Sequence, residues 1–201
     1  DPGRHGGITA LLASPFNPPG TSILPDELRR IDAVVRGHGG VTIVDEIYLG
    51  LSYDATFGHS ALQLGEHIVS VNSFSKYFNM TGWRLGWLVL PPALVAPMER
   101  LAQNLFICAS TIAQHAALAC FEAESIAEYE RRRAEFRARR DKVVPALNAL
   151  GLRVPVEPDG AFYAYIDCSA HHPDSWGFAF QLMDSAQVAL ISAGAGLIVV
   201  A

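Results

Sequence analysis

The chain has 201 residues, of which 50% are apolar and 17% charged, as in an ordinary globular protein. Its net charge of -5 argues against a nucleic-acid partner held by bulk electrostatics, and no apolar run reaches the ~20 residues of a membrane span. Cys108, Cys120 and Cys168 are too few and too scattered for a disulfide framework or a zinc site. We therefore expect reduced cysteines, a cytoplasmic location, and neither a metal site nor a membrane partner.

Apolar runs of strand length alternate with turn signals in the first half of the chain. Residues 8–14 form the first predicted strand and lead into a turn rich in proline and glycine. Residues 25–39 predict a helix with a proline in its first turn, early acidic residues and glycines at its end. Further strands are predicted over residues 41–48, 67–75 and 85–91. Near-continuous apolar strands separated by helices or long connections indicate a buried, largely parallel sheet.

The second half of the chain has a different pattern. Residues 96–150 have a helical pattern that ends at Gly151, and residues 152–169 predict two strands around a Pro-Asp-Gly turn. A further helix is predicted over residues 175–187, and a strand begins at about residue 188. We place a domain change in the long helical stretch, which gives a first domain over residues 1–125 and a second over residues 126–201.

Polar side chains follow the predicted strands at the ends where ligands bind in parallel α/β sheets. The first strand is followed by Asn17, the second meets Asp45 and Tyr48, the third ends with Ser73, Ser75 and Lys76, and Arg84 precedes the fourth. This convergence is more informative than any single residue.

Two cations lie close together in a stretch that has no anion, which suggests an anionic ligand. Arg84 and the hydroxyls of Ser73 and Ser75 suit a phosphate group. The amine of Lys76 suits an aldehyde, with which it can form a Schiff base.

The remaining residues suit an aromatic ring. Asp45 can hold the proton of a pyridine nitrogen, and the neutral donors Asn17 and Tyr48 can bond a phenolate oxygen. A phosphate, an aldehyde, a protonated pyridine and a phenolate together describe pyridoxal 5′-phosphate.

Each residue also has an ordinary structural interpretation. Asp45 could cap a helix, Tyr48 could be a core tyrosine, and Arg84 could pair with Glu46 or Asp54. Taken together, these interpretations require several coincidences in the right order. The basic run over residues 130–142 is interrupted by acids and is typical of a solvated helix face.

These motifs resemble the fold-type I, class I/II aminotransferases of the aspartate aminotransferase superfamily. The matching stretches are NPPG (17–20), DEIYLGLSYD (45–54) and SFSKYFNMTGWRLGW (73–87). GAFYAYID (160–167) resembles a strand of the family's small domain, and NLFICASTIAQHAAL (104–118) resembles the helix after the cofactor block.

The resemblance implies a PLP-transferase-like fold, incomplete at both ends. Residues 1–125 are expected to form part of a three-layer α/β/α large domain that binds the cofactor, and residues 126–201 part of a small α+β domain. The family's phosphate loop, its ring-stacking aromatic residue and the arginine that grips the substrate carboxylate are expected to lie outside the resemblance. A homodimer is also implied.

The implied activity is transfer of an amino group between an amino acid and a 2-oxo acid. Lys76 would hold the cofactor as a Schiff base and, once freed by the substrate, move a proton as general base and acid. A C–S β-lyase of the same fold uses the same residues, so elimination remains an alternative. A truncated PLP-fold module without catalysis is the alternative from another class.

Overall fold

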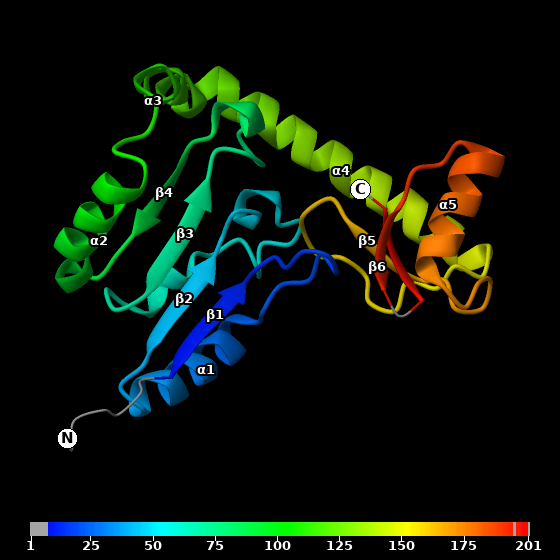
Figure 1. Cartoon of the computed structure of the whole chain (residues 1–201), viewed down its shortest axis with the longest axis horizontal. Helices are drawn as coiled ribbons and strands as arrows, with labels where there is room; N and C mark the ends of the chain where they lie inside the picture. The colour runs from blue at the N-terminus through cyan, green and yellow to red at the C-terminus, as the bar shows by residue number, and fades with distance from the viewer. Residues whose placement is uncertain (1–7, 195, 201) are drawn as a thin grey trace.

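The computed structural model describes residues 8–194 and 196–200. Its larger sheet has four strands in the order β1-β2-β3-β4 (Figure 1). These are β1 (Thr9–Ala13), β2 (Val41–Asp45), β3 (Val69–Ser73) and β4 (Gly86–Val89). The first three strands are parallel, as predicted, whereas β4 runs antiparallel to β3.

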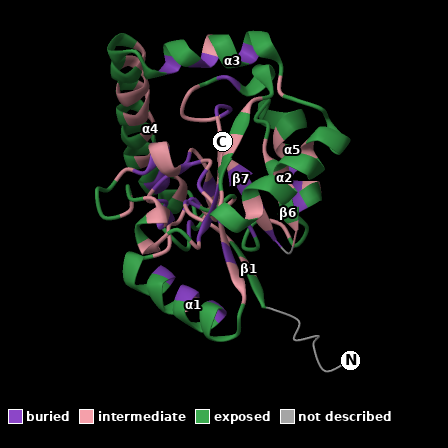
Figure 2. Cartoon of the chain, turned by 90° about the vertical axis from the view of Figure 1, so that its left-hand side faces the viewer, coloured by how far each residue is buried: buried purple, intermediate pink, exposed green. Residues whose placement is uncertain are grey.

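Helix α1 (Pro25–Gly37) packs on this sheet through one face, whose buried residues are Leu28, Asp32 and Val35. Its Leu28 joins Val44 and Ile68 in one buried cluster. Figure 2 shows buried positions recurring along a single side of α1, as expected of an amphipathic helix at a sheet surface. The predicted helix and its stop at the glycines are confirmed.

The predicted helical stretch over residues 96–150 consists of several helices. They are α2 (Pro92–Leu105), α3 (Thr111–Leu118) and the 27-residue α4 (Ala123–Ala149). Short 3-10 turns occupy Leu49–Leu51, Ala61–Leu64, Thr81–Trp83 and Ala119–Phe121. Residue 125 lies in the first turn of α4, so the division into 1–125 and 126–201 remains a prediction. None of the helices in the described ranges is long and apolar enough to cross a membrane.

A second sheet forms beyond α4, at the right of Figure 1, and is antiparallel throughout. It contains β5 (Ala164–Asp167), β7 (Leu197–Val200) and β6 (Ile191–Gly194) in that order, and α5 (Ser175–Ala186) packs against it. Its core is a cluster that includes Ile166 and Ile198, both fully buried. The predicted helix over residues 175–187 and the following strand are confirmed.

The prediction of two strands around the Pro-Asp-Gly turn is wrong for the upstream strand. Only an isolated bridge between Arg153 and Asp167 forms there, and residues 154–163 are irregular. Pro155 and Pro158 lack the N–H donors that a ladder requires. The segment bonds to the first half of the chain instead, since the Asp159 N–H donates to the Gly20 carbonyl at 3.0 Å.

The hydrogen bonds of the Asp167 carboxylate predict that the second sheet loses stability in acid. Hydrogen bonds from the Ser169 hydroxyl (2.6 Å) and from Arg153 (2.8 Å) lower the pKa of Asp167 from 3.8 to about 2. A group whose pKa is lower in the folded state adds stability above its unfolded pKa and loses it as the pH falls through the folded value. At pH 6 we expect the midpoint of thermal unfolding of the wild-type chain to exceed that of the Asp167→Asn variant. The difference should shrink between about pH 4 and pH 2, and a constant difference would contradict this assignment.

Candidate active site

The topology of the larger sheet gathers the predicted site residues at one edge. Because β1, β2 and β3 are parallel, the residues that follow them lie at the same end of the sheet. Because β4 is antiparallel, the residue before it returns to that end as well. The residues concerned are Asn17, Asp45, Tyr48, Ser73, Ser75, Lys76 and Arg84.

Lys76 lies in the turn that follows β3, with its amine directed toward aromatic rings. Its Nζ is 5.8 Å from the ring centroid of Tyr48 and 5.7 Å from that of Phe162. An ammonium at this distance interacts favourably with a ring face. Lys76 and Tyr48 therefore face the same space, although they are far apart in the sequence.

Tyr48 is buried beneath this space, with only 5% of its surface exposed. Its hydroxyl lies 2.8 Å from the hydroxyl of Tyr163. Burial, followed by the contact with Tyr163, raises the pKa of Tyr48 well above its usual range, while a hydrogen bond with Asn17 acts in the other direction. Tyr48 is therefore a neutral hydrogen-bonding group at any physiological pH.

Asp45 ends β2 and is half-buried. Its Oδ1 accepts a hydrogen bond from the Ile47 N–H at 3.0 Å, which leaves Oδ2 for another partner. The neighbouring carboxylate of Glu46 is used structurally, since it accepts bonds from the hydroxyls of Ser60 (2.9 Å) and Ser70 (2.5 Å). Adjacent strand residues point to opposite faces, so the carboxylate that remains for a ligand at this edge is Asp45.

A hydrogen-bonded loop connects the predicted phosphate residues. The Ser75 N–H donates to the Ser73 hydroxyl at 3.0 Å, and the Ser75 carbonyl accepts from the Thr81 hydroxyl at 2.5 Å. Arg84 then donates to the Thr81 carbonyl at 2.9 Å, with its backbone in the left-handed region at φ 53°. The guanidinium of Arg84 is exposed, so its remaining donors face solvent. The Ser73 hydroxyl donates to the Leu85 carbonyl at 3.3 Å, and the Thr81 hydroxyl is already used, so the donors that this loop offers to an anion are the Arg84 guanidinium and the Ser75 hydroxyl.

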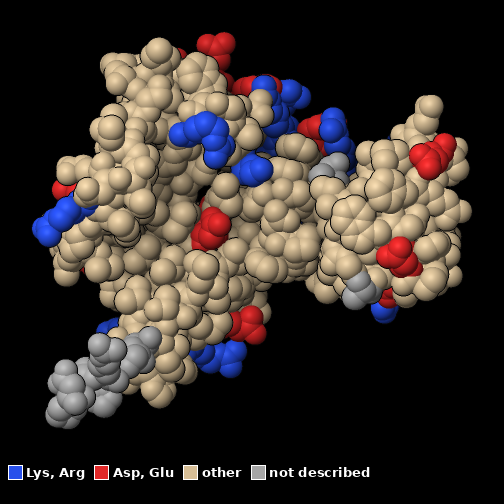
Figure 3. All heavy atoms as spheres, in the orientation of Figure 1, with Lys and Arg blue, Asp and Glu red and all other residues tan. Residues whose placement is uncertain are grey.

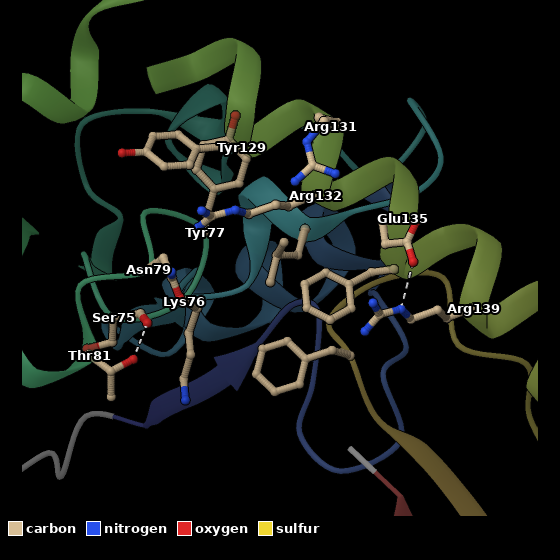
Figure 4. A pocket seen from close by; sticks show the side chains of 13 residues that line it. Ser75, Lys76, Tyr77, Asn79, Thr81, Tyr129, Arg131, Arg132, Glu135 and Arg139 are labelled. Carbon is tan, nitrogen blue, oxygen red and sulfur yellow. Dashed lines mark hydrogen bonds and ion pairs between the residues drawn. The ribbon is translucent and has the colours of Figure 1, made fainter. Parts of the chain in front are cut away.

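A cavity of about 590 Å³ opens beside Lys76 (Figure 4). Its other wall is α4, which contributes Arg131, Arg132 and Arg139. Glu135 also lines it and pairs with Arg139 at 2.9 Å. Figure 3 shows the basic side chains gathered over α4, with acidic ones among them. The volume is within the range of small-molecule sites.

Several residues at this edge were not singled out from the sequence. Phe162 and Tyr163 contact Lys76 and Tyr48, and Thr81 joins the serine loop. The sequence predicts only a strand for GAFYAYID, because residues 48 and 163 are 115 positions apart and no local pattern connects them. The Pro-Asp-Gly turn was the one local signal, and Asp159 within it bonds the Ser22 N–H at 2.9 Å.

Comparison with known proteins gives the family. The model of the family "Aminotransferase class I and II" matches residues 5–201. The chain belongs to this family. This aminotransferase-family chain is 39% identical over 181 residues to a valine–pyruvate aminotransferase of Mycobacterium tuberculosis, which covers 90% of the chain and 47% of that relative. It is 34% identical to an arginine–pyruvate transaminase of Pseudomonas aeruginosa, covering 90% of the chain and 46% of the relative.

Solved aminotransferase structures share the fold. An aminotransferase from Mycobacterium tuberculosis superimposes with a TM-score of 0.90 at 36% identity, covering 95% of this aminotransferase-family chain and 51% of that structure. An aromatic aminotransferase from Pyrococcus horikoshii gives 0.87 at 32% identity, covering 96% and 54%. The predicted PLP-transferase-like α/β fold is thus confirmed. The chain spans about half the length of the relatives it matches.

Proposed function

We propose that this protein is a pyridoxal-phosphate-dependent aminotransferase, which transfers an amino group between an amino acid and a 2-oxo acid. The observation that carries the proposal is the meeting of Lys76, Tyr48 and Asp45 at one sheet edge, with the Lys76 amine 5.8 Å from the Tyr48 ring. Membership of the aminotransferase class I and II family supports it.

The donor set fits each part of the proposed cofactor. Ser73, Ser75 and Arg84 would hold the phosphate, since they belong to one hydrogen-bonded loop with an exposed guanidinium. Asp45 would hold the ring nitrogen through its Oδ2, and Lys76 would hold the aldehyde carbon. When bound, the cofactor supplies an electron sink for negative charge at the substrate's α-carbon.

The chain's own residues would then act as follows. Lys76 removes and returns a proton at the α-carbon, because its amine lies beside the Tyr48 ring and its side chain lines the neighbouring cavity. Asp45 holds a cationic ring nitrogen in place through a charge pair. Tyr48 and Asn17 donate hydrogen bonds to the phenolic oxygen, and burial keeps Tyr48 protonated for this role.

The relatives favour transamination over the alternatives. The curated proteins described above are named as aminotransferases or transaminases. Elimination of a thiol and a non-catalytic role have no such support.

The first test is covalent capture of the cofactor. We expect pyridoxal phosphate followed by borohydride to label the 201-residue chain at Lys76, because its amine lies in the site, whereas Lys142 is exposed on α4. Peptide mass mapping locates the label. The Lys76→Ala variant should lose it completely.

Lys142→Ala is the matched control, since Lys142 is the other lysine of the sequence. It should label as the wild type does. Equal labelling of both lysines, or none, would contradict the proposed site. A labelled chain that converts no amino acid to its 2-oxo acid would favour the non-catalytic alternative.

We also propose a homodimer in the cytoplasm. Large apolar side chains are exposed along the α2–α3 connection, including Leu105 (71%), Ile107 (79%) and Ile112 (73%), and such a patch is typical of an interface. The three cysteines are free, as expected in a reducing compartment. Sedimentation equilibrium tests the dimer, and a monomer at micromolar concentration would contradict it.

A further inference from the structure

The loop over residues 154–163 brings a second hydroxyl to the candidate site. It is held against the connections that follow β1 and β2 by hydrogen bonds from the Ser22 N–H (2.9 Å) and the Tyr53 N–H (2.8 Å) to Asp159. At its end, the Tyr163 hydroxyl lies 2.8 Å from that of Tyr48. The two rings meet edge to face, with centroids 5.7 Å apart and planes at 79°. This geometry fixes the hydroxyls against each other.

The direction of this hydrogen bond depends on what else Tyr48 bonds. A phenolic hydroxyl has a single proton, and its oxygen can also accept. Without another acceptor, either tyrosine can be the donor. Once Tyr48 gives its proton to an anionic oxygen, the bond to Tyr163 persists only if Tyr163 becomes the donor.

We propose that Tyr163 is a positioning residue, which donates to the Tyr48 hydroxyl and strengthens Tyr48 as a donor to the cofactor's phenolic oxygen. The inference rests on the proposed function. Hydrogen bonds in a chain polarise one another, so a hydroxyl that accepts a bond donates more strongly. Two charged groups also face Tyr48, namely Lys76 and Asp45.

The proposal predicts a spectroscopic effect of Tyr163→Phe. Weaker donation to the phenolic oxygen disfavours the form in which that oxygen carries the full negative charge. The pKa of the lysine-bound cofactor, followed through its visible absorbance, should therefore rise by roughly half a unit. The measurement is an absorbance titration of the cofactor-loaded chain against pH.

Tyr53→Phe is the matched control. The Tyr53 hydroxyl donates to the Ala161 carbonyl of the same loop and so anchors the loop as a purely structural contact. A pKa that rises in Tyr163→Phe and stays unchanged in Tyr53→Phe supports the proposal. No change in Tyr163→Phe, or an equal change in both variants, would overturn it. If the wild type itself shows no label on Lys76, the proposed function fails first, and this inference falls with it.

Discussion

Asp45→Asn is expected to weaken the binding of pyridoxal phosphate by about two to three orders of magnitude. Removing one partner of a buried charge pair typically costs about 3–5 kcal/mol, because the other charge is left uncompensated, and we expect the lower part of this range because Asp45 is only half-buried. Asparagine keeps the shape of Asp45 and can still accept the bond from the Ile47 N–H, so the local turn should survive. The dissociation constant is measured by titrating the cofactor absorbance of each variant.

Glu66→Gln provides the control for this experiment. Glu66 is an exposed carboxylate before β3, and it therefore lies at the other end of the sheet from Asp45. The substitution changes the net charge equally and should leave cofactor binding unchanged. If the Asp45→Asn variant binds pyridoxal phosphate as tightly as the wild type does, Asp45 is not part of the cofactor site.

Ile166→Ala is expected to lower the free energy of unfolding of the chain by about 2–5 kcal/mol. Ile166 is fully buried and pairs with Ile198 across β5 and β7. The same cluster includes Val144 of α4 and Phe178 of α5. The substitution leaves a cavity where these elements meet, and urea denaturation measures the loss.

Ile191→Ala is the control, because it removes an isoleucine from a strand without opening a cavity in the core. Ile191 lies on β6 in the same sheet but is 61% exposed. We expect it to cost less than about 1 kcal/mol. Similar losses at the two positions would mean that the second sheet lacks a tightly packed core.

Local patterns predicted the elements that local physics controls. The apolar runs of β1, β2 and β3 and the amphipathic α1 were placed correctly, since burial periodicity and turn residues act over a few positions. The same argument failed over residues 154–163. There the apolar residues suggested a strand, but prolines and contacts with the NPPG turn determined an irregular loop.

The candidate site shows the same division. Residues at or shortly after the end of a strand, such as Asp45 and Lys76, could be proposed from the sequence because strand ends are local features. The sequence by itself thus determined the α/β class and the family, and it predicted a cofactor-binding set. Only the tertiary structure decided that β4 reverses direction and returns Arg84 to this edge, and that Tyr163 meets Tyr48. Such contacts join residues far apart along the chain, and they are set by how whole elements pack.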